Sequence, residues 1–178
     1  MALIVEDGTG LADAESYCTL AFATGYHAAR GNASWAAVAT DAAKEALLRK
    51  ATDFMVQAYR MRWDGYRLTA TQALDWPRAL VMRRDRVGVM SGYSANSYYE
   101  ANVVPPEVQR ACAELGLRAI TVDLAPDQGR VTIREKIDVL EFEYAQGSLA
   151  YTQFRAVEEL LATFFGGAGK NSARVLRV

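Results

Sequence analysis

Arginine and aromatic residues are interleaved along one stretch of the sequence, from Arg60 to Arg86. Seven arginines stand there against three aspartates, with two tryptophans and a tyrosine among them: Arg60, Arg62, Arg67, Arg78, Arg83, Arg84 and Arg86; Asp64, Asp75 and Asp85; Trp63, Tyr66 and Trp76. Guanidinium groups pair with phosphates and aromatic rings stack on unpaired bases, so this composition suits single-stranded nucleic acid.

A second interpretation of the same stretch is that the aromatic rings are core and the arginines pair with acidic residues of a neighbouring subunit. Both residue types are enriched at protein interfaces. The net charge of the chain is only -1, and no nucleic-acid-binding motif is present, which favours the interface interpretation.

Residues suited to catalysis or metal binding are few. His27 is the only histidine, and a catalytic histidine needs a positioned partner. Cys18 and Cys112 have no CxxC spacing and no histidine-type ligand nearby, so we expect two free, structural thiols and no zinc site. The acidic residues of the N-terminal region lack the spacing of a calcium loop: Glu6, Asp7, Asp13 and Glu15.

Two further motifs resemble catalytic ones only superficially. The run 166–171, Gly-Gly-Ala-Gly-Lys-Asn, fails as a phosphate loop because Phe164 replaces the first glycine and Asn171 replaces the Ser or Thr that holds magnesium. Glu141 and Glu143 could act as an acid and a base, but their alternation with apolar residues is typical of the solvated face of a strand. The sequence therefore predicts no enzyme, no cofactor and no bound metal.

Composition indicates one globular domain spanning residues 1–178. Hydrophobic residues make up 51% and charged residues 23% of the 178, which is an ordinary balance for a packed domain. No apolar run approaches the roughly 18 residues of a membrane span. The N-terminus lacks the basic start and apolar core of a signal peptide, and the two isolated cysteines suit a reducing compartment.

Hydrophobic spacing predicts a mainly α fold, a small helical bundle with one β-hairpin. Thr19 is expected to cap a helix to about Ala29, and Thr40 or Asp41 to cap the longest helix, to about Met61. Its expected buried stripe is Leu47, Ala51, Phe54, Met55 and Ala58. Pro105 and Pro106 open a third helix, in which Gly116 allows close helix approach, and a last helix covers about 154–165. Alternation that changes phase over 131–144 predicts the hairpin.

Two connecting segments stand out. The run Thr71–Arg78 pairs a buriable indole, Trp76, with Pro77, and we expect a rigid corner preceded by a short helical turn. Residues 82–103 form a long loop rich in Ser, Gly, Asn and Tyr, and loops of this length inside compact domains are usually functional or disordered.

Several segments resemble known phage proteins. Ala2–Tyr17, Thr71–Ala79 and Val104–Leu115 resemble the phage family labelled DnaT-like single-stranded-DNA-binding proteins. The hairpin Arg134–Tyr144 resembles a strand pair common to head–tail connector proteins of tailed phages. Residues 82–103 depart from the family pattern, because the segment is longer here.

The resemblance implies a head–tail adaptor of a tailed bacteriophage: a helical bundle with a hairpin and extended N- and C-terminal arms, assembled as a ring of about twelve copies below the portal. Its implied partners are the portal protein, a tail or stopper/nozzle protein and the genome DNA passing through the channel. The location would be the neck of the virion, after synthesis in the host bacterial cytoplasm. The alternative is a single-stranded-DNA-binding replication accessory protein.

Under the adaptor interpretation, three sets of residues are expected to make contacts. The tail 168–178 would dock on the portal through Lys170, Arg174, Val175, Leu176, Arg177 and Val178. Hairpin and loop residues would contact neighbouring subunits or the tail: Glu135, Lys136, Ile137, Asp138, Tyr93, Tyr98 and Tyr99. Arg83, Arg84 and Arg86 would face DNA.

Overall fold

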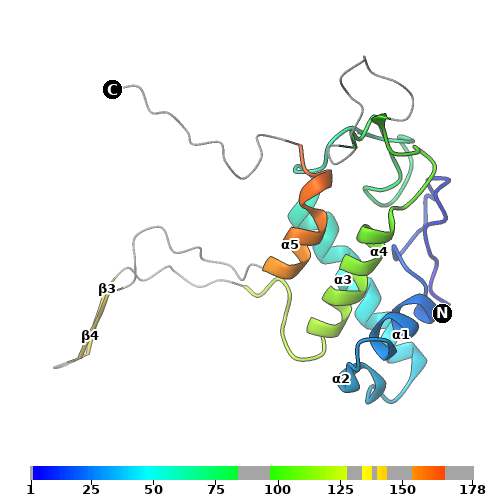
Figure 1. The fold of residues 1–178 in the computed structure, drawn as a ribbon. Helices are drawn as coiled ribbons and strands as arrows, with labels where there is room; N and C mark the ends of the chain where they lie inside the picture. Colours follow the sequence, from blue (N-terminus) through cyan, green and yellow to red (C-terminus); the bar gives the residue numbers. More distant parts are fainter. Residues whose placement is uncertain (1, 84–96, 128–133, 138–139, 144–153, 167–178) are drawn as a thin grey trace, which may run out of the picture.

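The protein is described by a computed structural model covering residues 2–83, 97–127, 134–137, 140–143 and 154–166 (Figure 1). This part of the chain is mostly helical, with a small two-stranded antiparallel hairpin, as the sequence predicts. No described helix is both long and apolar enough to cross a membrane. The C-terminal tail 168–178 lies outside the described residues.

The described helices include two that begin at the predicted caps, Thr19 and Thr40, and one short helix, 33–36, that the sequence did not predict. They are α1 (Leu20–Ala28), α2 (Ala33–Ala36), α3 (Asp41–Tyr59), α4 (Pro106–Arg118) and α5 (Arg155–Leu161), the last continued by the 3-10 turn η3 (Ala162–Phe164). The hydroxyl of Thr19 accepts a hydrogen bond from the amide of Phe22, and that of Thr40 from the amide of Ala43. Each bond satisfies an amide that the first helical turn leaves unpaired.

The core lies where α4 packs between α3 and α5 (Figure 1). A Cβ atom on Gly116 would lie 3.2 Å from Leu48 and 3.4 Å from Trp35, so this position allows the close approach predicted for it. The predicted stripe of α3 is partly wrong, because Ala58 is exposed and Leu47 and Phe54 are only half-buried. The residues that α3 buries are Leu48, Ala51, Thr52, Met55 and Tyr59.

The N-terminal segment before α1 packs against this body. Tyr17 and Cys18 are buried, and Val5 pairs with Ser16 in a parallel bridge. The carboxylate of Glu6, only 3% exposed, accepts hydrogen bonds from the amides of Gly8, Gly10 and Leu11. Glu6 therefore organises its own loop.

Two short antiparallel pairs complete the fold. The predicted hairpin is confirmed as β3 (Arg134–Ile137) and β4 (Leu140–Glu143), with Arg134 opposite Glu143. The second pair, β1 (Tyr66–Arg67) and β2 (Arg78–Ala79), places Tyr66 opposite Ala79. At the ends of the 82–103 segment, Met82 pairs with Tyr98 and the amide of Arg83 donates to the carbonyl of Ser97.

Candidate nucleic-acid interface

The stretch that follows α3 folds around two buried indoles. Trp63 and Trp76 meet edge to face with ring centroids 5.8 Å apart, and Trp76 meets Phe164 in the same way at 5.3 Å. Trp76 is fully buried, and the peptide bond to Pro77 is cis. The predicted corner and its buried indole are confirmed. These two rings belong to the core, so they are closed to a ligand.

The helical turn expected before Trp76 does not form, because the Gln72 side chain satisfies the backbone there instead. Its amide nitrogen donates to the carbonyls of Leu74 (2.8 Å) and Pro77 (3.1 Å), and its oxygen accepts from the amide of Thr69 at 2.8 Å. This side chain is 3% exposed. It fixes the connection between β1 and β2 as a compact loop.

Arg78 is the structural arginine of the stretch. Its guanidinium donates to the carbonyls of Gly65 (2.7 Å), Asp64 (2.8 Å) and Asp75 (3.2 Å). The residue is 7% exposed, and burial lowers the pKa of its guanidinium although Asp75 opposes that shift. Arg78 therefore holds the turn at 64–65 against the corner and does not face solvent.

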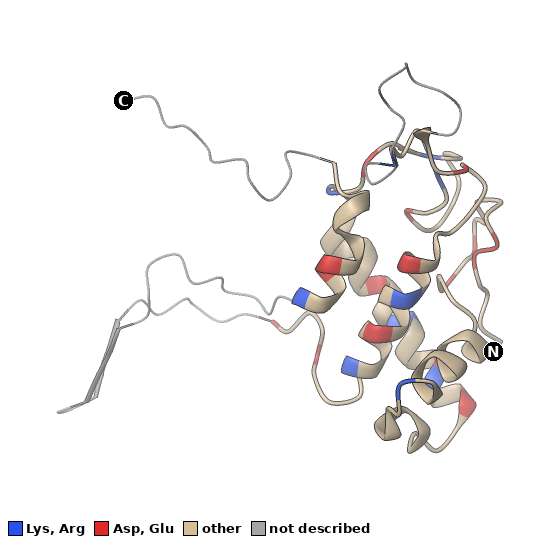
Figure 2. Cartoon of the chain, in the orientation of Figure 1, with Lys and Arg blue, Asp and Glu red and all other residues tan. Residues whose placement is uncertain are grey.

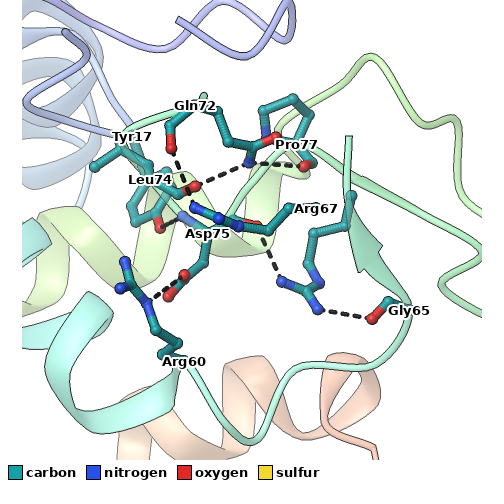
Figure 3. A network of polar contacts seen from close by, with 9 residues as sticks. Tyr17, Arg60, Gly65, Arg67, Gln72, Leu74, Asp75 and Pro77 are labelled. Atoms are coloured by element: carbon teal, nitrogen blue, oxygen red, sulfur yellow. Dashed lines mark hydrogen bonds and ion pairs between the residues drawn. The ribbon is translucent and has the colours of Figure 1, made fainter. Parts of the chain in front are cut away.

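Asp75 sits between the core and the surface. Its side chain is fully buried, and its Oδ1 accepts a hydrogen bond from Nε of Arg60 at 3.0 Å. Its amide donates to the hydroxyl of Tyr17 at 3.0 Å. Arg67 approaches the same network from β1 and donates to the carbonyl of Gln72 at 3.2 Å (Figure 3). Two arginines from different elements are thus anchored, Arg60 on the carboxylate of Asp75 and Arg67 on the carbonyl of Gln72.

Among the exposed residues of this stretch, we call four together the Tyr66 surface: Arg60, Tyr66, Arg67 and Leu80. Tyr66 is 71% exposed, the Arg60 side chain is 50% exposed, and Arg67 is also exposed. Among the residues whose side-chain burial the structure describes, which exclude β3 and β4, Tyr66 is the one exposed aromatic residue. Residues 60–83 hold five arginines and two aspartates, with no lysine or glutamate, while the whole chain has a net charge of -1.

Two further arginines of the stretch, Arg62 and Arg83, are engaged within the chain. Arg62 pairs with Glu158 at 3.2 Å and lies 4.2 Å over the ring of Phe165. Arg83 lies 4.7 Å over the ring of Tyr99. Arg84 and Arg86 lie outside the described residues. The acidic partners seen, Asp75 and Glu158, belong to the same chain, whereas the interface interpretation assigned them to a neighbouring subunit.

Elsewhere charges of both signs are interspersed. Glu107, Arg110, Glu114 and Arg118 follow one another along α4 (Figure 2). Two adjoining hollows of about 470 and 500 Å³ flank α3 and share Phe54, Gln57, Leu124 and Ala125. Neither hollow is lined by a member of the Tyr66 surface, so these two hollows and that surface are separate.

Residues considered for catalysis have structural contacts. His27 is buried, with Nε2 3.0 Å from the carbonyl of Ala113 and Nδ1 3.0 Å from the Asn32 amide nitrogen. Cys18 and Cys112 are free and buried, as predicted. Glu15 bonds to Arg49 at 2.9 Å. Among the described side chains, no three histidines, cysteines or acids cluster as metal ligands.

Most of the residues assigned to adaptor contacts lie outside the residues that the structure describes. Tyr93, Asp138, Lys170 and 174–178 lie outside the described residues, and Glu135, Lys136 and Ile137 are placed only as members of β3. Tyr98 and Tyr99 are half-buried beside Met82 and Arg83. Within the described residues, Arg83 of the DNA-facing set therefore lies beside Tyr99 of the subunit-contact set.

One comparison with known proteins gives a match. The model of the family described as "Putative DnaT-like ssDNA binding protein" matches residues 1–178. No curated protein and no solved structure matches the chain.

This match corrects the head–tail adaptor interpretation. The matching family is one of single-stranded-DNA-binding proteins and not a head–tail connector family, so the ring below the portal and the portal, tail and stopper/nozzle partners are wrong. The hairpin misled the interpretation because alternation over two short strands is common to antiparallel pairs in general. The match agrees with the alternative interpretation.

Proposed function

The chain belongs to the DnaT-like single-stranded-DNA-binding family, and we propose on that premise that it binds single-stranded DNA through the Tyr66 surface. The observation that carries the location is Tyr66 itself. Its ring is 71% exposed and contacts no aromatic ring or guanidinium in the described chain. An exposed ring in a segment rich in arginine offers a base a stacking face, and such stacking contributes about 1–3 kcal/mol per base.

Arg60 and Arg67 supply the charge for adjacent phosphates. Nε of Arg60 is held by Asp75, and one terminal nitrogen of Arg67 is held by the carbonyl of Gln72. An arginine anchored through one N–H keeps other N–H groups for a phosphate and loses less side-chain entropy when it binds. The carboxylate of Asp75 therefore pre-orders Arg60, and the carbonyl of Gln72 pre-orders Arg67.

We propose a DNA-binding role for the protein and no enzymatic activity. The net charge of -1 gives no general attraction to nucleic acid, so affinity depends on the local surplus of arginine. Binding by so few phosphate contacts should be moderate in affinity and should weaken as salt increases, because counterions compete for the phosphates.

The test is a salt titration of binding to a fluorescent oligothymidylate, followed by fluorescence anisotropy. We expect the logarithm of the affinity to fall linearly with the logarithm of the salt concentration. Arg67→Gln should reduce the slope by about 0.7, the value for one single-strand phosphate contact.

Arg155→Gln is the matched control, because the Arg155 side chain is 91% exposed on α5 and away from this surface. It should leave the slope unchanged. Equal slopes for the wild type, Arg67→Gln and Arg155→Gln would place binding elsewhere, and no binding at low salt would reject the function.

A further inference from the structure

Leu80, the residue after β2, combines two unfavourable features. Its φ is 60°, and it is the one non-glycine residue with a positive φ in the described chain. Leucine is disfavoured there because its Cβ crowds the following carbonyl oxygen. Its side chain is also 58% exposed, so burial does not offset the strain.

The backbone on both sides of Leu80 is fixed by its neighbours. A Cβ on Gly65 would clash with the carbonyl oxygen of Ala79 and lie 3.0 Å from the Leu80 carbonyl carbon, so the two backbones are in close contact. After Leu80, the fully buried Val81 accepts a hydrogen bond from the amide of Tyr99 at 2.9 Å. A strained residue persists when its surroundings determine its conformation in this way, and such residues are concentrated at functional sites.

The position of Leu80 relative to Tyr66 indicates a role for its strained backbone. Tyr66 follows Gly65 directly and stands opposite Ala79 in the β1–β2 pair, so Leu80 is next to the strand that carries the exposed ring. An exposed apolar side chain one residue beyond the strand partner of an exposed ring suits the flat, largely apolar face of a base.

We propose that Leu80 is a DNA-contacting residue, whose left-handed backbone holds its side chain against a base that stacks on Tyr66. The inference rests on the proposed function and adds a residue and a base-level contact to it. In a duplex the base faces are occupied by stacking, so this contact selects single strands over duplex of the same phosphate density.

Two substitutions separate contact from strain. Leu80→Gly removes the side chain and relieves the strain, since glycine adopts positive φ readily. It should weaken binding to oligothymidylate about five- to tenfold, from partial loss of leucine burial, and should raise the midpoint of thermal unfolding. Leu80→Ala keeps the strain, so it should weaken binding similarly without raising the midpoint.

Val122→Ala is the control for loss of an exposed apolar side chain, because Val122 is 47% exposed beyond the end of α4. It should leave binding unchanged. Tyr66→Ala is measured alongside, so that the contact and the proposed function can fail separately.

If Tyr66→Ala weakens binding and both Leu80 variants bind as the wild type does, the Leu80 contact is rejected and the Tyr66 surface stands. If none of the three weakens binding, the surface itself is rejected. Weakening by Val122→Ala equal to that by Leu80→Ala would show a nonspecific effect and also overturn the inference.

Discussion

Two regions of the molecule combine tyrosine with arginine, and they differ in how fully their groups are used. We call the first the Tyr26 cluster: Phe22, Tyr26, Arg30, Glu114 and Arg118, on α1, the turn after it and α4. There Arg30 covers the Tyr26 ring at 3.5 Å, Phe22 stacks on it at 6.2 Å, and the hydroxyl donates to Glu114 at 2.9 Å. On the Tyr66 surface the ring has no such cover within the described chain, and it is 71% exposed.

The same residue types therefore do not by themselves make a binding surface. In the Tyr26 cluster, Glu114 accepts from both Tyr26 and Arg118, so the polar groups satisfy one another and join α1 to α4. In the Tyr66 surface, the polar partners lie beneath the exposed groups, at Asp75 and the carbonyl of Gln72. Those partners orient the arginines and leave the outer faces open.

The largest expected effect is on the free energy of unfolding, and it distinguishes the buried Arg78 from the exposed Arg67. Arg78→Met removes the donors that three carbonyls share, and it should lower the free energy of unfolding by about 3 kcal/mol. Arg67→Met should lower it by less than about 1 kcal/mol, because Arg67 is exposed. Urea denaturation measures both. Equal effects would show that Arg78 is not the structural member of the pair.

The second effect tests whether the Tyr26 cluster is structural. Tyr26→Ala removes the hydrogen bond to Glu114 and the ring beneath Arg30, and it should lower the free energy of unfolding by about 1–2 kcal/mol. Tyr66→Ala should change it by less than about 0.5 kcal/mol, since the ring is mostly solvated. Urea denaturation measures both changes. An equal loss of unfolding free energy in Tyr66→Ala and Tyr26→Ala would show that the two tyrosines do not differ in structural role.

A pH effect should follow from His27, which lies beside the Tyr26 cluster. Burial holds the pKa of His27 below its usual 6.5, although the Ala113 carbonyl and Glu114 oppose the shift, while Arg30 and Arg118 add to it. Well above pH 6.5 the imidazole of His27 is neutral in both the folded and the unfolded chain, so it does not lower the free energy of unfolding. As the pH falls below 6.5 the unfolded chain takes up the proton first, so stability declines until the folded-state pKa is reached.

The measurement for His27 is urea denaturation at pH 7.5 and 5.5, with His27→Gln as the comparison. The wild type should lose more stability on acidification than the variant does. An identical loss in both would mean that His27 is not the group that responds.

The smallest effect concerns an arginine that is already engaged. Arg62 pairs with Glu158 and covers Phe165, so Arg62→Gln should change the affinity for oligothymidylate by less than about twofold. Anisotropy at fixed salt measures this change. A loss as large as that for Arg67→Gln would extend the interface toward α5.

Local signals in the sequence predicted much of the fold. Thr19 and Thr40 mark the starts of α1 and α3 because a hydroxyl before a helix satisfies an unpaired amide. Gly116 and Trp76 were placed correctly because close packing and indole burial follow from residue type. The buried face of α3 was misplaced in part because Thr52 is buried with its hydroxyl on the carbonyl of Leu48, which makes a polar residue part of the core.

The site was harder to predict, because it depends on contacts between distant residues. The sequence identified the stretch 60–86 and named Arg83, Arg84 and Arg86 as DNA-facing. That stays a prediction, because Arg84 and Arg86 lie outside the described residues, and the proposed surface uses the exposed Arg60 and Arg67. Which aromatic residue stays uncovered follows from the packing of Trp63 and Trp76, which no spacing rule shows. A positive φ at Leu80 has no signal in a sequence without glycine at that position.

The most direct test is the affinity of Tyr66→Ala and Tyr26→Ala for the same fluorescent oligothymidylate at one low salt concentration. We expect a loss of about 1–3 kcal/mol in binding free energy for Tyr66→Ala and an affinity close to wild type for folded Tyr26→Ala. The reverse pattern, with Tyr26→Ala weakened and Tyr66→Ala unchanged, would contradict the account and move the interface to α1 and α4.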